Sequence, residues 1–259
     1  LHTSVNKGLY YKHLNLGTVT RTSPVDGRDM FYNAGGSNPL CFAGNANDTN
    51  PSGCLSNKSL RNLSYGTVTV VENTKKGSGN ALTLSLNAPT RNGFGWGVAY
   101  TRTSATEVSP LTSSTSNSNW LNRSIFNPNE EVAANSASLI RNRFNAQMNF
   151  SKAFFGKYKT SFGVVYEGRE GRPYSWVFAN DMNGDGVSGN DLLYIPKGPG
   201  SGEVLFRLPT TAGITSQAAL TAYQQQTASA AEAKFWSIVD SEPGLRNFKG
   251  GVVGRNTAF

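Results

Sequence analysis

Apolar and polar side chains alternate along residues 143–167. The odd positions of the first arm of this stretch carry charged, amide or hydroxyl groups. Its even positions are apolar: Phe144, Ala146, Met148 and Phe150. The second arm repeats the pattern with Phe162, Val164 and Tyr166. Because successive side chains of a strand point to opposite faces, each arm is predicted to be an amphipathic strand, and a turn at residues 154–157 joins the two into a hairpin.

The length and the aromatic flanks of this hairpin favour a pair of strands in a membrane. Each arm has roughly the 9–11 residues that a tilted strand needs to cross a bilayer. Aromatic side chains bracket the turn, as in the interfacial girdle of a barrel: Phe150, Phe154, Phe155 and Tyr158. A water-soluble β-sandwich alternates in the same way with its apolar face turned inward, and this alternative stays open.

Two earlier stretches carry the same alternation on either side of a turn at residues 89–93. Residues 80–87 place leucine at three even positions, and residues 94–101 place bulky apolar side chains opposite Gly, Ala or Thr. Large residues on one face and small or polar ones on the other are typical of a wide barrel with lipid outside and water inside. The residues predicted to face lipid are Leu82, Leu84, Leu86, Phe94, Trp96, Tyr100, Phe144, Met148, Phe150, Phe162 and Tyr166.

The other faces of these strands are polar and are predicted to border an aqueous lumen. The residues predicted to face the lumen are Arg141, Arg143, Asn145, Gln147, Lys159 and Glu167. Two roles stay open for their charges, because charged side chains either line a transport path or form salt bridges across neighbouring strands.

The connections between the predicted strands alternate between short and long. Short turns are predicted at residues 89–93 and 154–158, and long loops at about 104–137 and 168–250. This asymmetry is typical of an outer-membrane barrel, whose short turns lie on the periplasmic side. A third long loop is expected at residues 17–63, which either holds a further strand or lies on the periplasmic side.

The remaining segments add two strands and a helix. Strands are predicted at residues 5–16 and 64–72, the second closed by a turn at residues 75–79. A helix is predicted at residues 216–239, inside the last long loop, and Pro243 is a stop signal beyond its end. We expect this helix to pack on neighbouring loops rather than to contact a ligand. The fold class is therefore predicted to be all-β: one antiparallel barrel domain with one loop helix.

Composition and charge narrow the functional classes. Only 15% of the residues are charged, and the formal net charge of +8 comes from scattered Lys and Arg residues. Without a basic cluster or a nucleic-acid-binding motif, nucleic-acid binding is not expected. A basic barrel rim that faces anionic lipid accounts for the charge. The sequence has no run of about 18 apolar residues, so no transmembrane helix is predicted.

The two cysteines, Cys41 and Cys54, enclose a segment rich in Asn, Gly, Asp and Pro. Such a loop suits a disulfide in an oxidising compartment such as the bacterial envelope. Two free thiols are the alternative, and an envelope location favours the disulfide.

Residues 181–191 match the first half of an EF-hand-type calcium loop. The candidate ligands are the side chains of Asp181, Asn183, Asp185 and Asp191 and the backbone of Val187. Oxygen groups stand at alternate positions, and Gly186 makes the sharp turn that such a loop requires. Asp191 stands at the eleventh place, whereas a bidentate acid is expected at the twelfth. A turn of the Asx type that never binds metal is the alternative.

The sequence offers little for catalysis. His2 and His13 are its only histidines, and no Ser or Cys nucleophile motif accompanies them. Adjacent acids such as Glu130 and Glu131 are predicted to be solvated charges rather than an acid–base pair. No enzymatic activity is expected.

The order of several motifs resembles the C-terminal barrel portion of Oar-like TonB-dependent outer-membrane transporters. The runs that carry the resemblance are Asn80-Ala81-Leu82-Thr83-Leu84, Asn92-Gly93-Phe94, Tyr100-Thr101, Asn119-Trp120, Arg143-Phe144-Asn145, Gly168-Arg169-Glu170-Gly171-Arg172-Pro173-Tyr174-Ser175, Asp181-Met182-Asn183-Gly184-Asp185-Gly186, Asn190-Asp191-Leu192-Leu193-Tyr194-Ile195-Pro196, Arg246-Asn247-Phe248-Lys249-Gly250 and Gly254-Arg255-Asn256. The resemblance covers residues 64–259 well and residues 1–63 poorly. Its most specific part is the Gly-Arg-Pro-Tyr-Ser run joined to residues 181–196.

The resemblance implies a barrel of about 22 strands with an N-terminal plug, in the outer membrane of a Gram-negative bacterium. It also implies the partners: outer-membrane lipid and lipopolysaccharide, TonB through the plug region, and a large or scarce solute. The chain holds about six or seven such strands and matches neither the plug nor the closing strands. Residues 1–259 are therefore expected to be a segment of a longer transporter.

Two other functions fit the same strands. A passive porin-like channel uses such strands without a plug. A secreted, calcium-stabilised β-sandwich, acting as an adhesin or a carbohydrate-binding module, turns the apolar faces inward. The strand pattern alone does not separate these functions, and it does not name the solute.

Overall fold

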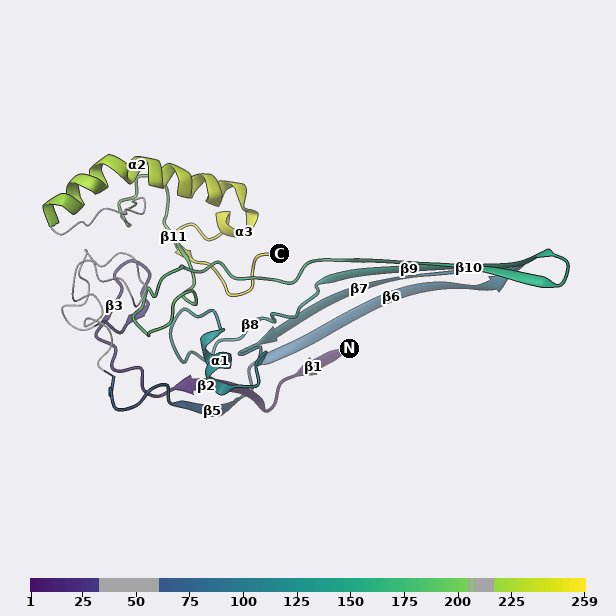
Figure 1. Cartoon of the computed structure of the whole chain (residues 1–259), viewed down its shortest axis with the longest axis horizontal. Coiled ribbons are helices and arrows are strands. Elements are labelled where there is room, and N and C mark those ends of the chain that lie inside the picture. The colour runs from purple at the N-terminus through teal and green to yellow at the C-terminus, as the bar shows by residue number, and fades with distance from the viewer. Residues whose placement is uncertain (33–60, 205, 207–216) are drawn as a thin grey trace.

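A computed structural model of the protein describes residues 1–32, 61–204, 206 and 217–259. Figure 1 shows the course of the chain from the N-terminus in purple to the C-terminus in yellow. The expected disulfide between Cys41 and Cys54 lies outside the described residues.

One six-stranded antiparallel sheet dominates the fold (Figure 1). Its four long strands, here called the long sheet, are β6 (Gly77–Arg91), β7 (Phe94–Glu107), β9 (Asn142–Phe155) and β10 (Tyr158–Arg169). The short strand β1 (His2–Ser4) pairs with β6, and β8 (Ala134–Asn135) pairs with β7. The order β1-β6-β7-β9-β10 leaves β10 with β9 as its one partner among the described strands. The predicted antiparallel β fold is thus confirmed, and the described strands form an open sheet rather than a closed barrel.

Both hairpins of the long sheet close with tight turns, as predicted. Asn92 (φ 53°) and Gly93 (φ 83°) adopt left-handed backbone conformations, as in the two-residue type I′ turn that Asn-Gly favours. A Cβ atom on Gly93 would lie 2.1 Å from the carbonyl oxygen of Ser151, so the turn approaches β9 too closely for any other residue. Gly156 (φ 61°) lies in the turn between β9 and β10.

The long connections lie at the other end of the long sheet from the two turns (Figure 1). We call their described parts the loop head: residues 5–32, 61–76, 108–133, 170–204, 206 and 217–259. Three two-stranded sheets lie in the loop head: β2 (Gly8–His13) with β5 (Thr69–Thr74), β3 (Arg21–Thr22) with β4 (Asp29–Met30), and β11 (Tyr194–Ile195) with β12 (Gly251–Val252). Its described helices are α1 (Ser116–Leu121), α2 (Gln217–Ser241) and α3 (Pro243–Arg246).

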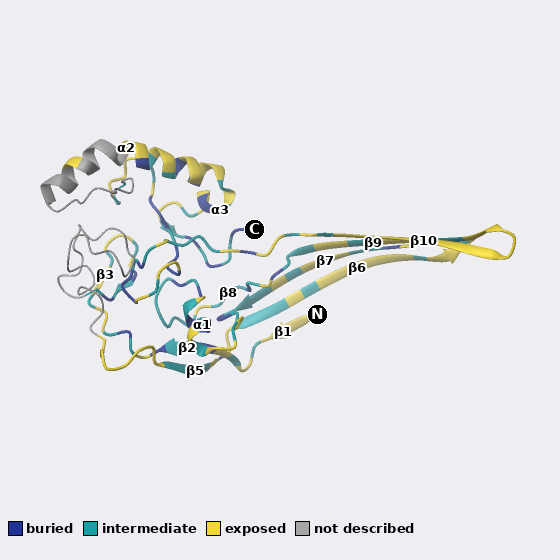
Figure 2. Cartoon of the chain, viewed as in Figure 1, coloured by how far each residue is buried: buried dark blue, intermediate teal, exposed yellow. Residues whose placement is uncertain are grey.

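The buried hydrophobic core lies in the loop head, whereas the long sheet is largely exposed (Figure 2). Two clusters of buried side chains form the core: Ile195, Trp236, Val239, Leu245 and Val253 in one, and Leu16, Phe31 and Trp120 in the other. Helix α2 therefore packs on neighbouring segments through Trp236 and Val239, as expected for the loop helix.

The prediction of a turn at residues 75–79 that closes the strand at 64–72 was wrong. Strand β5 pairs with β2 and not with β6, so the chain between β5 and β6 connects two different sheets. Glu72 of β5 accepts a hydrogen bond from Tyr10 (3.0 Å) and pairs with Lys12 (2.7 Å), both on β2. Local turn signals do not reveal a partner so far away in the chain.

The helices and loop boundaries also differ from expectation. The described residues contain three helices, whereas the sequence predicted one. Helices α1 and α3 were missed because, at six and four residues, they are too short to show a helical period. Strand β7 continues to Glu107, so the loop expected from residue 104 begins later. The segment 17–63 holds β3 and β4 in its described part. Among the described helices, none combines the length and the apolar composition that crossing a bilayer requires.

Candidate functional site

The long sheet has an apolar face that is continuous across four strands. Directly opposed residues of antiparallel strands share a face, and the register opposes Phe94 to Phe150 and Phe150 to Phe162. Two further rows across β6, β7, β9 and β10 are Leu86-Val98-Ala146-Tyr166 and Leu84-Tyr100-Phe144-Gly168. Leu82, Trp96 and Met148 belong to the same face by register. The structure thus brings all the residues predicted to face lipid onto one surface.

The large apolar side chains of this face are uncovered. Leu84 is 63% exposed and Phe162 is 62% exposed, whereas Ile195 in the core of the loop head is 0% exposed. In a β-sandwich, such side chains interdigitate with those of a second sheet. The described residues form no second sheet against this face. The sealed interior that a sandwich requires is therefore missing from the described part of the chain.

Aromatic side chains stand at both ends of the apolar face. Phe94 belongs to a row near the short turns, and Tyr100 belongs to a row toward the loop head. The two rows lie six residues apart along β7 (94 to 100), roughly 20 Å at about 3.3 Å per residue. The hydroxyl of Tyr100 donates to Asn142 Oδ1 (2.7 Å), where the polar end of the sheet begins. Such aromatic rows flank the apolar band of membrane barrels.

The opposite face of the long sheet is polar. Arg143 lies 3.0 Å from Glu167, so these two charges form the cross-strand salt bridge that was one of their two expected roles. Asn145 and Gln147 follow Arg143 on the same face, and Lys159 joins that face through its pairing with Ala153. Arg141 differs, because it precedes β9 and its guanidinium lies 3.7 Å from the ring centre of Phe259.

Two glycines of β7 leave room on this polar face for side chains from the neighbouring strands. A Cβ atom on Gly97 would lie 2.4 Å from Asn87 Oδ1, and one on Gly95 would lie 2.8 Å from Asn149 Oδ1. Amide side chains from β6 and β9 therefore reach across β7 above its glycines. The result is a surface of hydrogen-bonding groups, which suits contact with water and polar solutes.

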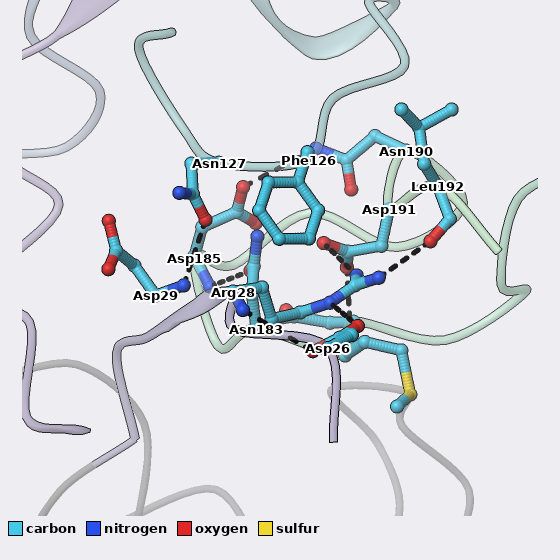
Figure 3. A network of polar contacts seen from close by, with 12 residues as sticks. Asp26, Arg28, Asp29, Phe126, Asn127, Asn183, Asp185, Asn190, Asp191 and Leu192 are labelled. Carbon is cyan, nitrogen blue, oxygen red and sulfur yellow. Dashed lines mark hydrogen bonds and ion pairs between the residues drawn. The ribbon is translucent and has the colours of Figure 1, made fainter. Parts of the chain in front are cut away.

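A second candidate site is the acidic loop, residues 181–191, which lies in the loop head and has several buried polar side chains (Figure 3). The φ angles of Gly184 (82°) and Gly186 (93°) fold the loop back on itself, so the sharp turn predicted at Gly186 is present. The carboxylate of Asp181 accepts the N–H groups of Gly184 (2.7 Å) and Gly186 (3.0 Å). The side chains that alternate along the loop are buried: Asp181, Asn183 and Asp185, together with Asn190 and Asp191.

Arg28, between β3 and β4, holds the end of the acidic loop (Figure 3). Its Nη1 lies 3.3 Å from Asp191 Oδ1, and its Nη2 donates to the carbonyl oxygen of Leu192 (2.6 Å). Its Nε donates to Asp26 (2.6 Å). The second oxygen of Asp191 accepts the N–H of Met182 (2.8 Å). The positive charge of Arg28 thus already neutralises Asp191, which leaves this acid less suited to a metal than the sequence predicted.

The carboxylates of the acidic loop are electrostatically strained. Burial and the nearby carboxylates of Asp181 and Asp191 raise the pKa of Asp185 to about 7. Burial also raises the pKa of Asp191 to about 6, although its backbone hydrogen bond and Arg28 pull it down. Among the described ion pairs, none brings a cation to Asp185. A positive charge placed beside Asp185 would therefore stabilise its ionised form.

Two buried amide atoms of this loop have no hydrogen-bond partner among the described residues. They are Asn190 Oδ1 and Asn183 Nδ2, on side chains that are 3% and 0% exposed. The Nδ2 of Asn190 lies 3.4 Å from Asp185 Oδ2, so it is the nitrogen of this amide that contacts the carboxylate. Buried polar atoms are normally satisfied, and an oxygen in this position calls for a donor or a cation.

The metal prediction remains a prediction. The described residues contain no group of three or more His, Cys, Asp or Glu side chains arranged to hold a metal ion. The acidic loop offers two carboxylates together with amide oxygens, which is a ligand set for Ca²⁺ rather than for a softer metal.

An apolar cavity of about 470 Å³ lies in the loop head between the β3–β4 hairpin and α2. Its apolar lining includes Val25, Met30, Phe178, Met182, Leu193 and Phe235. Asp26 and Arg28 stand in its wall, so this cavity adjoins the polar network of the acidic loop. Its volume falls within the range of about 300–1,000 Å³ that is typical of sites for small molecules.

Several residues around the acidic loop carry no signal in the sequence. Arg28 meets Asp191 across 163 residues of chain, and a single arginine has no local pattern that identifies such a partner. The hydroxyl of Tyr32 donates to the backbone oxygen of Asp181 (2.5 Å). The Asp191-to-Arg28 contact is visible only once the β3–β4 hairpin is placed against the loop.

Comparisons with known proteins found no relative of this chain: no family model, no curated protein and no solved structure matches it. The resemblance to TonB-dependent transporters therefore stays a proposal. Its physical support is the long sheet and the loop head themselves.

Proposed function

We propose that this chain is part of the barrel of an outer-membrane TonB-dependent transporter, which takes up a large or scarce solute. The long sheet crosses the outer membrane of a Gram-negative bacterium, with its short turns in the periplasm and the loop head outside. The observation that carries this proposal is the uncovered apolar face of the long sheet.

Lipid is the partner that suits this face. Removing apolar surface from water is worth roughly 25 cal/mol per Å², and large contiguous apolar patches mark membrane or protein contacts. A strand of 14 residues such as β7 or β9 is about 45 Å long, and at a tilt of about 45° it rises about 30 Å, the thickness of the hydrocarbon core. The aromatic side chains around the short turns match the girdle at one interface of a bilayer, a feature that a protein partner does not require.

The open edges of the sheet support completion by further strands. Strand β10 has β9 as its one described partner, and β1 covers only Ser78 to Asn80 of β6. Lipid cannot satisfy the unpaired N–H and C=O groups along such edges. In our proposal further strands of the same barrel pair with β10 and β6, and the resemblance motivates a total of about 22.

The loop head supports capture of a solute more than free diffusion. It has its own hydrophobic core, and its apolar cavity is large enough for a small molecule or an apolar group of a larger one. Contact with lipopolysaccharide, a plug and engagement of TonB complete the proposal, and the resemblance motivates them.

A spin-label experiment on two adjacent residues of β6 tests the lipid contact. Leu86→Cys and Ser85→Cys variants of the protein in lipid vesicles each receive a nitroxide label. The label at position 86 is expected to collide mainly with oxygen, which concentrates in lipid. The label at position 85 is expected to collide mainly with a water-soluble nickel chelate. An immobile label at position 86 that neither reagent reaches places this side chain in a protein core and overturns the proposal.

Conductance separates an active transporter from a passive channel. In planar bilayers, the full-length protein with its plug is expected to give no steady potassium chloride current. Steady conductance of the intact protein would instead establish the porin-like alternative, with the same strands and an open bore.

A further inference from the structure

We propose that the acidic loop binds a calcium ion through the carboxylates of Asp181 and Asp185 and the side-chain oxygen of Asn190. This site goes beyond the transport function and does not depend on it. The ligands come from the first, fifth and tenth places of the loop, so the set differs from the one that a twelve-residue EF-hand loop uses.

The amide of Asn190 is the observation that points to a ligand. This side chain is 97% buried, its oxygen has no hydrogen-bond partner among the described residues, and its nitrogen reaches Asp185 Oδ2 (3.4 Å). A buried oxygen without a donor costs about 1–3 kcal/mol unless something compensates it. A cation bound at this oxygen supplies the missing partner, and the carboxylates of the same loop attract it.

The role of Asp191 explains how the loop departs from the EF-hand pattern. Asp191, the acid at the eleventh place, forms an ion pair with Arg28 and accepts a hydrogen bond from the N–H of Met182. This arrangement ties the end of the loop to the β3–β4 hairpin. The preceding residue, Asn190, contacts Asp185 through its amide nitrogen. The loop therefore replaces a distal acid ligand with an amide ligand.

The chemistry of the ligand set favours calcium. Carboxylate and amide oxygens are hard ligands, and Ca²⁺ accepts six to eight of them in irregular geometry, whereas Mg²⁺ requires a near-ideal octahedron. Backbone carbonyls and water can supply the remaining ligands. The amide groups of Asn183 and Asn190 are buried with the two acids, as an irregular oxygen cage requires.

Binding at this position would stiffen the loop head. The backbone oxygen of Asn183 accepts the N–H of Phe31 (2.6 Å), and the hydroxyl of Tyr32 donates to the backbone oxygen of Asp181 (2.5 Å). The acidic loop is thus bound to the chain that follows β4. An ion that fixes the loop therefore also fixes this segment, which contributes Phe31 to the core.

Terbium luminescence tests the site, because Tyr32 lies against the loop. Tb³⁺ replaces Ca²⁺ on oxygen ligands and emits when an adjacent tyrosine is excited. The purified protein in lipid nanodiscs is expected to sensitise Tb³⁺, and Ca²⁺ is expected to displace it with a Kd on the order of 10⁻⁴–10⁻³ M, as in extracellular calcium modules. A Tyr32→Leu variant is expected to lose the emission but to keep a rise in melting temperature with Ca²⁺.

Ligand variants separate binding from a structural role. Asn190→Ala and Asp185→Asn are expected to abolish the Ca²⁺-dependent rise in melting temperature, whereas Asp240→Asn, at an exposed acid on α2, keeps it. Without calcium, Asp185→Asn is expected to melt no lower than the wild type, because it removes a buried charge.

Two results overturn the site. One is a wild-type protein that neither sensitises Tb³⁺ nor gains melting temperature with millimolar Ca²⁺. The other is an equal response to Mg²⁺, which contradicts the assignment to calcium. Neither result affects the spin-label test of the long sheet, so the two proposals fail independently.

Discussion

The guanidinium of Arg28 lies 3.3 Å from the carboxylate of Asp191, although 163 residues separate the two in the chain. Both side chains are buried, at 1% and 0% exposed. The pair fastens the β3–β4 hairpin to the acidic loop, and it adjoins the apolar cavity of the loop head. A contact of this kind is expected to control the stability of the loop head without affecting the long sheet.

Replacing Arg28 by Met is expected to destabilise the loop head by about 3–5 kcal/mol, because it leaves the charge of Asp191 buried and unpaired. Hydrogen exchange of the amides of β11 and β12 measures this loss. The double variant Arg28→Met with Asp191→Asn is expected to recover much of the protection. Lys249→Met, which removes an exposed pair with Asp240 (3.1 Å), is expected to cost only about 0–1 kcal/mol. Equal losses for Arg28→Met and Lys249→Met would contradict the role of the buried pair.

A charged side chain on the apolar face of β6 is expected to lower the unfolding free energy, whereas one on its polar face is expected to change it little. Leu86→Lys is expected to lower the unfolding free energy in lipid vesicles by about 2–4 kcal/mol, as a Lys does near the midplane of a membrane barrel. Ser85→Lys, one residue away on the polar face, is the matched control and is expected to change it by less than about 1 kcal/mol. Urea titration of the vesicle-bound protein measures both. Similar effects of the two variants would show that neither face contacts hydrocarbon.

The two tight turns are expected to respond differently to alanine. At Gly93, φ is 83° and a Cβ atom would lie 2.1 Å from the carbonyl oxygen of Ser151, so Gly93→Ala must displace the backbone of β9 or of the turn. Gly156 has a φ of 61° but nothing within 4 Å of its Cβ position, so Gly156→Ala meets only the left-handed penalty of about 1–2 kcal/mol. Unfolding free energies of the two variants provide the comparison. A loss at Gly93 no greater than that at Gly156 would disprove the close approach.

His13 is expected to make the loop head less stable below pH 6.5, whereas the raised pKa values of Asp185 (about 7) and Asp191 (about 6) act in the opposite direction. Burial, with a contribution from Arg61, lowers the pKa of this imidazole below its ordinary value of 6.5. The unfolded chain therefore binds a proton at this imidazole more readily than the folded chain does, so the contribution of His13 to stability rises with pH through this range. The stabilisation is present above pH 6.5 and is lost as the pH falls toward the lowered pKa.

Hydrogen exchange of β2 between pH 5 and 7.5, corrected for intrinsic rates, measures this dependence. The ring of His13 packs edge-on against Trp120 (4.9 Å between ring centres), and its Nδ1 accepts the N–H of Asn15 (2.9 Å). A His13→Gln variant keeps an acceptor but removes the titration, so it is expected to lose less stability than the wild type as the pH falls below 6.5. An unchanged slope in this variant would assign the pH dependence to another group.

The long strands were predictable because their signal is local. A period of two over ten or more residues and an Asn-Gly turn each depend on neighbours in sequence. The register then places Leu84, Tyr100 and Phe144 in one row, as the alternation around each of them indicates. The alternation did not reveal what the apolar face contacts, because a sandwich and a barrel alternate in the same way.

The loop head was not predictable in this way, because its contacts are long-range. Strand β5 pairs with β2 rather than with β6, and Arg28 contacts Asp191, which is 163 residues away in the chain. The acidic loop shows both cases. Its alternating acids and the turn at Gly186 were visible in the sequence, whereas the capture of Asp191 by Arg28 was not. Because Arg28 pairs with Asp191, a cation in this loop has to bind other oxygen atoms than those of Asp191.

The difference between local hairpins and distant contacts has a consequence for the order of assembly. Strands β6 and β7, like β9 and β10, meet across turns of a few residues, so each hairpin forms from consecutive chain. The core of the loop head joins Leu16 to Trp120 in one cluster and Ile195 to Val253 in the other. Contacts of large sequence separation form slowly, so we expect the hairpins to appear early and the loop head to close last. Until it closes, Trp236 and its neighbours are open to chaperones and proteases.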